Sequence, residues 1–435
     1  MKEEIPGYTV AEAVQEARRC LNCPKPLCRT GCPIENEIPK FNHALAQGNI
    51  GEAYRIISEK SNLPAICGRV CPHENQCEGH CVLAKAGKGI KIGRIEKFIA
   101  DFYSENHLTN EKLVPKTKGK VAVIGSGPAG LTVAGDLARK GYNVVVYEAE
   151  QEPGGVLLYG IPDFRLPKEV VRREIKNIEA LGVTFVCNTR VGVDVSIDKM
   201  LEEGFEAVFI GAGTAVAKGL GIPGEELKGV VQSSYFLRMT RLYLDGKVGR
   251  SEVPVEEGDR VVVIGAGNVA MDACRTAVMM KASSVTDCYR KTIEFMKAAR
   301  AEYDGAVKDG VEFKWEHTPV EIVAENGKAA GLKVQTPEGE KIVPADKILI
   351  AVGSKPAGAI ISSTTGIEVD ESGYVITTKA PYGMTTKKGV FAGGDIVHKP
   401  ATVVLAMREA KKVAQGIADY IEACKLLGVQ SGSNQ

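Results

Sequence analysis

The sequence predicts an α/β protein: a mainly helical, cysteine-rich N-terminal domain followed by two Rossmann-like nucleotide-binding units. Three observations support this prediction. Eight of the 12 cysteines lie between Cys20 and Cys81. Two glycine-rich turns, beginning at Gly125 and Gly265, each follow a short apolar strand. After each turn come a helical stretch and a second apolar strand, which is the order of a βαβ unit. The unit therefore occurs twice, as an internal repeat.

The composition excludes several classes of protein. With 435 residues, the chain is long enough for two to four domains. Its formal net charge of +1 gives no overall field that would favour nucleic acid or an anionic membrane. The longest apolar runs, such as Ile348–Val352, are far shorter than the roughly 20 residues that cross a bilayer. The N-terminal stretch is charged and contains cysteines, unlike a signal peptide. We therefore expect a cytoplasmic protein.

Helices are expected between the cysteine-rich loops of the N-terminal part. Thr9–Arg19 has the pattern of a helix with Thr9 as its N-cap and Glu12 three residues later, as in a capping box. Ile34–Ile57 has the pattern of two amphipathic helices, and Ile92–Phe102 that of another.

The first glycine turn has the sequence typical of a dinucleotide-binding unit. We expect strands at Val121–Ile124 and Val144–Tyr147, with a helix at Leu131–Lys140 between them. In such a turn the first glycine permits the bend, the second lets the backbone approach a pyrophosphate, and the third lets helix and strand pack closely. An acid after the second strand is placed to accept a ribose hydroxyl. The predicted contacts are Gly125, Gly127, Pro128, Ala129, Gly130 and Glu148.

The second turn repeats this arrangement with alanine as its third small residue, an accepted variant. Its strands are expected at Val261–Ile264 and Ser284–Tyr289, with a helix at Met271–Met280 between them. The predicted contacts are Gly265, Gly267, Asn268, Val269 and Ala270.

The second strand of this unit ends in Arg290 and Lys291 instead of an acid. A carboxylate would repel the extra phosphate of NADP, whereas a guanidinium can bind it. Lys297 and Arg300 are close enough in sequence to join the same pocket. We therefore predict NADPH rather than NADH, and the alternative is a solvated basic turn.

Three more apolar strands end in glycine: Ala207–Gly213, Lys347–Gly353 and Val390–Gly394. Gly353 is a further predicted cofactor contact. A helix from about Ala401 to Tyr420 is expected after the last strand.

The eight N-terminal cysteines have the spacing of metal ligands. They form two runs of four, each with a cysteine–proline pair: Cys20, Cys23, Cys28 and Cys32, then Cys67, Cys71, Cys77 and Cys81. Paired cysteines can build zinc sites, which is the competing interpretation. Iron–sulfur clusters are favoured because two nucleotide-binding units occur in the same chain, and a flavin can supply clusters with single electrons. Spacing alone suggests one cluster for each run of four.

The other cysteines are expected to be structural. They are Cys187, Cys274, Cys288 and Cys424. Because no CxxC follows Cys23, the chain has no cysteine pair for disulfide redox chemistry. The six histidines are scattered, and no catalytic acid, base or nucleophile is predicted.

The whole pattern resembles the glutamate synthase small (β) subunit family. That family includes the NADPH-binding large subunit of NADH-dependent ferredoxin:NADP oxidoreductase, sulfide dehydrogenase subunits and the N-terminal half of dihydropyrimidine dehydrogenase. The resemblance covers nearly all of residues 8–422. It is carried by Cys20–Cys23, Cys67–Pro72, Ile92–Glu96, Pro153–Gly155, Ile161–Pro167 and Phe391–Asp395.

The resemblance implies interleaved cluster ligands, which differ from those that local spacing suggests. Cys20, Cys23, Cys28 and Cys81 would hold one 4Fe–4S cluster. The other would be held by Cys32, Cys71, Cys77 and Glu96, and Cys67 would be left over. The alternative for Glu96 is a surface charge on an amphipathic helix.

The resemblance also implies domains and flavin contacts. An iron–sulfur domain would span residues 1–110. An FAD-binding domain of glutathione-reductase type would comprise 111–225 and 353–435, with an NADPH-binding domain at 226–352 inserted into it. The implied contacts with FAD are Gly155, Arg165, Gly394 and Asp395, and Thr402 is a further candidate.

Three functions are compatible with these motifs, and each involves a partner that accepts or supplies electrons. The first is an NADPH-oxidising subunit of glutamate synthase type. The second is the NADP(H)-binding large subunit of an electron-bifurcating ferredoxin:NADP oxidoreductase. The third is an electron-relay and scaffold subunit of a larger redox complex. The expected cofactors are FAD, NADP(H) and two 4Fe–4S clusters.

Overall fold

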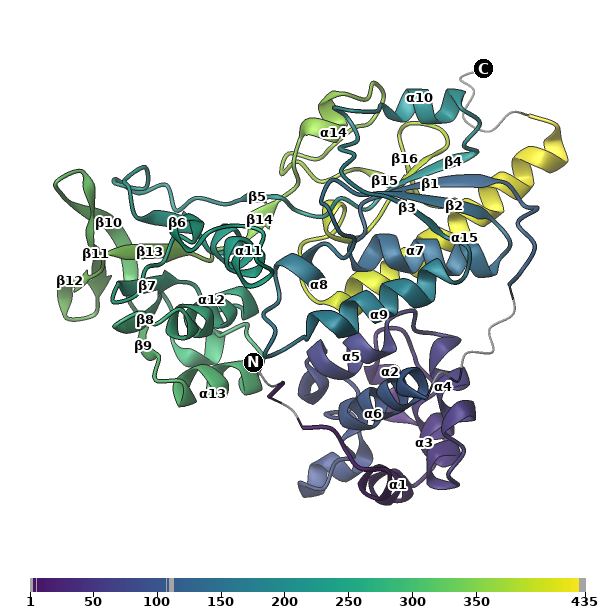
Figure 1. The fold of residues 1–435 in the computed structure, drawn as a ribbon, viewed down its shortest axis with the longest axis horizontal. Coiled ribbons are helices and arrows are strands. Elements are labelled where there is room, and N and C mark those ends of the chain that lie inside the picture. Colours follow the sequence, from purple (N-terminus) through teal and green to yellow (C-terminus); the bar gives the residue numbers. More distant parts are fainter. Residues whose placement is uncertain (1–2, 5, 107, 109–112, 430–435) are drawn as a thin grey trace. The chain divides into compact units, whose positions relative to one another are not determined.

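The computed structural model describes residues 3–4, 6–106, 108 and 113–429 (Figure 1). The chain forms two compact units. Unit 1 comprises the chain up to Leu158, residues 163–215 and the chain from Lys355 on. Unit 2 comprises residues 159–162 and 216–354. The finer division into three domains stays a prediction.

The N-terminal part of unit 1 is helical. Its helices enclose an apolar core whose members include the fully buried Phe41, Leu45 and Ile95. Thr9 and Glu12 form the predicted capping box at the start of the first helix. The helices are α1 (Val10–Arg18), α2 (Leu27–Gly31), α3 (Ile38–Ala46), α4 (Ile50–Ser58), α5 (Pro64–Val70) and α6 (Ile92–Glu105), with 3-10 turns η1 (His73–Asn75) and η2 (Val82–Ala86).

A seven-stranded sheet in the order β15-β16-β17-β4-β1-β2-β3 follows in unit 1. The strands from β17 to β3 are parallel, whereas β16 runs antiparallel to both of its neighbours. Their burial explains the continuous apolar runs, since β4 is buried at every position. The strands are β1 (Lys120–Ile124), β2 (Asn143–Tyr147), β3 (Thr184–Val186), β4 (Ala207–Ile210), β15 (Thr377–Lys379), β16 (Tyr382–Thr385) and β17 (Val390–Ala392).

Helices α7 and α15 lie side by side against this sheet, and α9 lies next to α7 (Figure 1). The helices that follow the N-terminal helical part are α7 (Pro128–Arg139), α8 (Val156–Tyr159), α9 (Lys168–Glu179), α10 (Ile197–Glu202), α14 (Ala359–Ser362) and α15 (Val403–Leu427), with the 3-10 turn η5 (Gly394–Ile396).

Unit 2 contains a five-stranded parallel sheet in the order β6-β13-β7-β8-β9 and a three-stranded antiparallel sheet, β10-β11-β12. The parallel strands are β6 (Val230–Gln232), β7 (Arg260–Ile264), β8 (Ser284–Tyr289), β9 (Glu312–Trp315) and β13 (Lys347–Ile350). The antiparallel strands are β10 (Thr318–Glu325), β11 (Lys328–Thr336) and β12 (Gly339–Pro344). The helices are α11 (Ser233–Leu244), α12 (Asn268–Met279) and α13 (Arg300–Lys308), with 3-10 turns η3 (Arg250–Glu252) and η4 (Ile293–Phe295). Two short strands, β5 (Val216–Ala217) and β14 (Ser354–Lys355), pair with each other.

The expected strands and helices occur where the sequence places them, and the differences lie at their ends. Strands β4, β13 and β17 end at Ile210, Ile350 and Ala392, before the glycines that were predicted to end them. Helices α7 and α12 begin at Pro128 and Asn268, because the last residues of each glycine turn already form the first helical turn. Helix α15 continues beyond the predicted Tyr420 to Leu427, where Gly428 ends it in the left-handed conformation. Among the described residues, no helix is long and apolar enough to cross a membrane.

Candidate cofactor-binding sites

Four cysteines from two distant segments line one cavity in unit 1. Cys20, Cys23 and Cys28 come from the segment that ends in α2, and Cys81 immediately precedes η2. The other residues that line this cavity are apolar, with the exception of Asn42. The fold therefore brings together cysteines that are about 50 residues apart in the sequence.

The thiols of this group influence one another electrostatically. The pKa of Cys28 is raised to about 11, by burial first and then by the charges of Cys20, Cys81 and Cys23. Such thiols become thiolates readily only when a positive centre lies among them. This donor set fits a 4Fe–4S cluster, which is held by four cysteine thiolates.

A second group consists of Cys32, Cys71, Cys77 and Glu96. Cys32 is the C-cap of α2, Cys71 is the C-cap of α5, and Glu96 lies on α6. Burial raises the pKa of Cys32 to about 12, and the charge of Glu96 acts in the same direction. Burial also raises the pKa of Cys77, followed by the charges of Glu96 and Cys32. The charge of Glu96 thus acts on Cys32, Cys71 and Cys77 alike.

The electrostatic neighbours of Cys28 and Cys32 differ, which is compatible with the interleaved ligands that the family resemblance implies. Cys28 has Cys81 as an electrostatic neighbour, whereas Cys32 has Glu96. Among the residues that the structure describes, no three or more His, Cys, Asp or Glu side chains are placed to hold a single metal ion. The assignment of the cluster ligands stays a prediction.

Glu96 is not the surface charge that was considered as an alternative. It is only 8% exposed. Its pKa is raised to about 8, by burial first and then by the charge of Glu174. A buried carboxyl group of this kind is stabilised in its charged form by a nearby cation, so its position suits a metal ligand.

Close packing of α5 against α6 brings this second group together. A Cβ atom on Gly68 would lie 2.5 Å from the backbone nitrogen of Lys97 and 2.9 Å from the backbone oxygen of Gly93. Only glycine permits so close an approach of the two backbones. The approach places the end of α5, with Cys71, beside the turn of α6 that carries Glu96.

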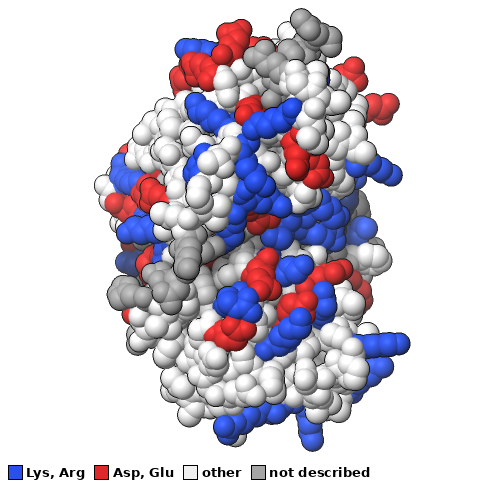
Figure 2. Space-filling view, turned by 90° about the vertical axis from the view of Figure 1, so that its right-hand side faces the viewer, with Lys and Arg blue, Asp and Glu red and all other residues white. Residues whose placement is uncertain are grey.

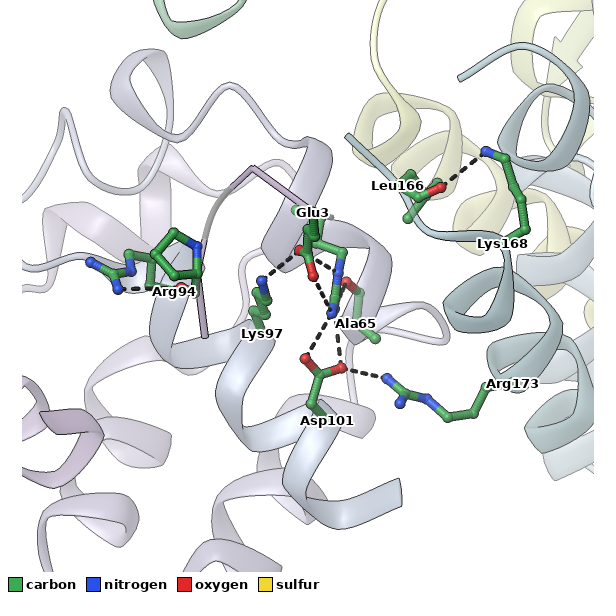
Figure 3. A network of polar contacts seen from close by, with 10 residues as sticks. Glu3, Ala65, Arg94, Lys97, Asp101, Leu166, Lys168 and Arg173 are labelled. Atoms are coloured by element: carbon green, nitrogen blue, oxygen red, sulfur yellow. Dashed lines mark hydrogen bonds and ion pairs between the residues drawn. The ribbon is translucent and has the colours of Figure 1, made fainter. Parts of the chain in front are cut away.

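A network of charged side chains fixes the same two helices (Figure 3). The guanidinium group of Arg69 on α5 donates to the Asp101 carboxylate on α6 at 2.7 and 3.1 Å. Asp101 also pairs with Arg173 on α9, and the Glu3 carboxylate lies 2.9 Å from Arg69 Nε. The Arg69 and Lys97 side chains are only 4% and 3% exposed, and both pair with Glu3. The network therefore links α5 and α6 to α9, which packs beside α7.

The first glycine turn has the geometry expected of a pyrophosphate site. A Cβ atom on Gly130 would lie 1.9 Å from the Gly125 oxygen, so helix α7 packs closely against the turn. A Cβ atom on Gly127 would meet nothing within 4 Å, which leaves the backbone open to a ligand. Pro128 begins α7, whose free N–H groups and dipole favour an anion.

Glu148 is held beside this turn by Ser126. The Ser126 N–H group donates to Glu148 Oε2 at 3.0 Å, and the Ser126 hydroxyl group donates to the same oxygen. The Glu150 N–H group donates to Glu148 Oε1 at 2.9 Å. Ser126 Oγ in turn accepts the Gly154 N–H group at 2.8 Å. Ser126 is a site residue that sequence reasoning missed, although a hydroxyl between two glycines of the turn was an available signal.

Two other predicted glycines approach the same turn. A Cβ atom on Gly155 would lie 3.0 Å from the Gly127 Cα atom, and one on Gly394 would lie 2.8 Å from the Ala129 Cβ atom. Asp395 follows Gly394 in η5, and burial raises its pKa to about 6. The fold therefore assembles the predicted FAD contacts from three segments of the chain.

The two other predicted FAD contacts, Thr402 and Arg165, lie on further segments of unit 1. Thr402 is the N-cap of α15, and its side chain accepts the Leu405 N–H group at 3.4 Å. Arg165 is half-buried in the loop that precedes α9.

The second glycine turn, in unit 2, is packed against two other segments. A Cβ atom on Gly265 would lie 2.5 Å from the Ala351 oxygen at the end of β13. The Lys297 and Ala298 N–H groups donate to the Ala266 oxygen at 2.9 and 3.0 Å. Asn268 Oδ1 accepts the Ala299 N–H group at 2.9 Å. The backbone of Lys297 is thus held at the turn, and the Asn268 side chain binds the nearby Ala299 backbone.

Gly267, Val269 and Gly353 leave this turn accessible. A Cβ atom on Gly267 or Gly353 would meet nothing within 4 Å, and Val269 is 45% exposed. Ala270, by contrast, is fully buried and packs in the core behind the turn.

The predicted phosphate-binding residues are exposed at the end of β8. Arg290 and Lys291 follow directly after this strand, and Lys291 Nζ lies 4.8 Å from the centre of the Phe295 ring. Strands β13, β7 and β8 are adjacent and parallel, so their carboxyl ends meet at the edge where nucleotides bind in such sheets. Arg300 is also exposed, but it pairs with Asp304 at 2.9 Å.

Comparisons with known proteins match both the N-terminal helical part and the nucleotide-binding part of the chain. A family model described as "Dihydroprymidine dehydrogenase domain II, 4Fe-4S cluster" matches residues 1–108. Another, "Pyridine nucleotide-disulphide oxidoreductase", matches residues 119–410. The glutamate synthase [NADPH] small chain of Halomonas elongata is 38% identical over 439 residues, which cover 95% of this chain and 92% of the relative.

Two further similarities extend these matches. The NAD-dependent dihydropyrimidine dehydrogenase subunit PreT of Escherichia coli K12 is 34% identical, and the match covers 98% of both chains. The structure of Mycobacterium tuberculosis FprA has a TM-score of 0.59 at 18% identity and covers 74% of this chain and 88% of that one. This last likeness shows the fold alone.

The fold and the two glycine turns define a pyridine nucleotide-disulphide oxidoreductase, in agreement with the model matched over residues 119–410. Within that class, the chain belongs to the family of the glutamate synthase small chains. It is therefore an NAD(P)H-dependent flavin and iron–sulfur oxidoreductase, as the sequence predicted.

Replacement of Asp101 by alanine is expected to destabilise unit 1. The change leaves the buried Arg69 guanidinium with the Glu3 carboxylate and the Ala65 carbonyl oxygen as partners. The free energy of unfolding should therefore fall by about 3 kcal/mol, at the low end for a broken buried ion pair. Glu52→Ala is the matched control, because it breaks an exposed pair with Arg55 and should cost at most about 1 kcal/mol. Urea unfolding measures both values. Equal losses of unfolding free energy in the Asp101 and Glu52 variants would contradict a stabilising role of the network.

Proposed function

We propose that the chain is the NADPH-oxidising subunit of a glutamate-synthase-type complex. It exchanges electrons between NADP(H) and a partner subunit through FAD and two 4Fe–4S clusters. The observation that carries this proposal is the cavity lined by Cys20, Cys23, Cys28 and Cys81, which lies in the same unit as the Ser126–Glu148 turn. Bound FAD and clusters would supply the change from two-electron to one-electron chemistry.

The residues of the chain have binding and positioning tasks in this proposal. The first turn and the start of α7 hold the FAD pyrophosphate, and Glu148 accepts a ribose hydroxyl group. In unit 2, the turn at Gly265 binds the pyrophosphate of NADPH, and Arg290 and Lys291 bind its extra phosphate. No side chain is assigned as an acid or a base, because hydride transfer between two rings requires orientation and exclusion of water rather than proton transfer.

A partner subunit belongs to the proposal because the Halomonas relative is by name a small chain. The surface offers both signs of charge to such a partner. On the face shown in Figure 2, Lys and Arg side chains gather in a band across the middle, with acidic side chains above and below it. We also place the protein in the cytoplasm, where thiolates of this kind stay reduced.

A subunit of dihydropyrimidine dehydrogenase type is the second candidate. The match with PreT over 98% of both chains favours it. Because PreT is named as NAD-dependent, nucleotide preference separates the two candidates. Identification of the partner chains in the native complex separates the glutamate synthase type from the bifurcating and relay types.

The cofactor content is the first test. Purified without oxygen, each chain is expected to carry one FAD and about eight iron atoms, as two cubane clusters require. Flavin absorbance and iron analysis measure both values. Bound zinc in place of iron, together with an absence of flavin, would contradict the proposed function.

Nucleotide preference is the second test. Replacement of Arg290 and Lys291 by glutamate should weaken NADPH binding on the order of a hundredfold or more, because each charge-assisted hydrogen bond contributes about 1.5–3 kcal/mol. NADH binding should change far less. Lys308→Glu with Lys328→Glu is a charge-matched control at exposed positions of the same unit. The test measures the Kd values of NADPH and NADH. Equal losses of affinity for both nucleotides would show that Arg290 and Lys291 do not bind the phosphate.

A further inference from the structure

Phe295 is a large apolar side chain that is exposed beside the second glycine turn in unit 2. It is the last residue of η4, in the segment that joins β8 to α13, and it is 59% exposed. A single exposed apolar residue needs no explanation by itself. The surroundings of Phe295 are distinctive, because its ring contacts one of the two residues that are proposed to bind the extra phosphate of NADPH.

The backbone on both sides of Phe295 is fixed by hydrogen bonds. The Tyr289 hydroxyl group, at the end of β8, donates to the Phe295 oxygen at 3.2 Å. Two residues after Phe295, the Lys297 N–H group donates to the Ala266 oxygen of the glycine turn at 2.9 Å. The segment therefore joins the end of β8 to the glycine turn, and it presents the exposed ring from a fixed backbone.

A cation lies over the Phe295 ring. Lys291 Nζ is 4.8 Å from the centre of the ring, which is within the range of a cation–π interaction. Arg290 precedes Lys291, and both side chains are exposed. The three residues thus place an aromatic ring next to two positive charges. This combination fits a ligand in which a flat aromatic base lies close to a phosphate.

The adenosine half of NADP(H) is such a ligand. Its adenine ring is attached to C1′ of the ribose, and its extra phosphate is attached through oxygen to the neighbouring carbon, C2′. The base therefore lies close to any group that binds this phosphate. The pyrophosphate, at the other side of the same ribose, is bound by the glycine turn in sheets of this kind. The segment that carries Phe295 connects the proposed positions of the two phosphate groups.

We propose that Phe295 binds the adenine ring of NADP(H) by stacking and completes, with Arg290 and Lys291, a site for the adenosine half of the nucleotide. Bases stack on aromatic side chains through their π faces. Because NADPH and NADH share the adenine ring, Phe295 contributes affinity for both, whereas Arg290 and Lys291 distinguish between them. This inference rests on the proposed function and adds a residue for the base.

The test measures binding to the full-length holoprotein, purified without oxygen, by isothermal titration calorimetry. The ligands are NADP+ and adenosine 2′,5′-bisphosphate, which lacks the nicotinamide half, and NAD+ is measured by displacement of the bisphosphate. Phe295→Ala should weaken all three roughly tenfold, which equals about 1.4 kcal/mol and is typical of the loss of one stacked base. Phe295→Tyr keeps the ring and should restore most of the affinity.

Ile342→Ala is the matched control. Ile342 is also 59% exposed, and it lies on β12 of the antiparallel sheet in the same unit. This variant loses an equally exposed apolar side chain away from the proposed site. Its affinities for the three ligands should equal those of the unmodified protein.

Two results would overturn the inference. Unchanged affinities in the Phe295→Ala variant would show that the ring does not contact the nucleotide. A loss confined to NADP+ and the bisphosphate, with NAD+ unaffected, would show that the ring only positions Lys291. An unmodified protein that lacks FAD and iron, or that binds none of the three ligands, would instead remove the proposed function, so the two failures are distinguishable.

Discussion

The close approach of α5 and α6 at Gly68 is the constraint on which the iron–sulfur part depends. A side chain at this position would meet the backbone of α6 at 2.5 Å, so the two helices could not keep their present distance. That distance brings Cys71 and Glu96, which are 25 residues apart in the sequence, into one group. The buried Arg69 and Lys97 lie on the same two helices, and their ion pairs with Glu3 and Asp101 hold the helices together.

The burial of so many ionisable groups favours a cationic centre beside them. The pKa values of Cys28 and Cys32 are raised to about 11 and 12, and that of Glu96 to about 8. Without a positive centre, these groups stay protonated, because burial and mutual repulsion oppose their charged forms. Bound iron would reverse this balance, since it would compensate the charge of each ligand that releases its proton. The groups are thus placed for a cofactor rather than for stability of the empty fold.

Much of the fold could be predicted from the sequence. Short apolar strands before Gly125 and Gly265 are specific signals, because few other arrangements need three small residues at that spacing. Thr9 and Glu12 likewise mark the start of α1. The extent of α15 was underestimated, although Ile421 and Cys424 continue its buried face beyond Tyr420.

The electrostatic neighbours of the cysteines could not be predicted from their spacing. Local spacing suggests that Cys28 and Cys32 share a centre, whereas the fold turns them to different neighbours, Cys81 and Glu96. The turn of α2 and the return of the chain from α5 to α6 cause this difference, and both are tertiary features. Ser126 was missed for a similar reason, since its role depends on Glu148 and Gly154, which come from other segments.

The central claim is that the ligands of the two clusters interleave along the chain. Single Cys28→Ala, Cys81→Ala and Cys32→Ala variants, reduced and examined by electron paramagnetic resonance with iron analysis, test it most directly. The account predicts that the Cys28 and Cys81 variants lose the same cluster signal, while the Cys32 variant loses the other and shares that loss with Glu96→Ala. Loss of one common signal from the Cys28 and Cys32 variants, with the other lost from the Cys81 variant, would contradict it.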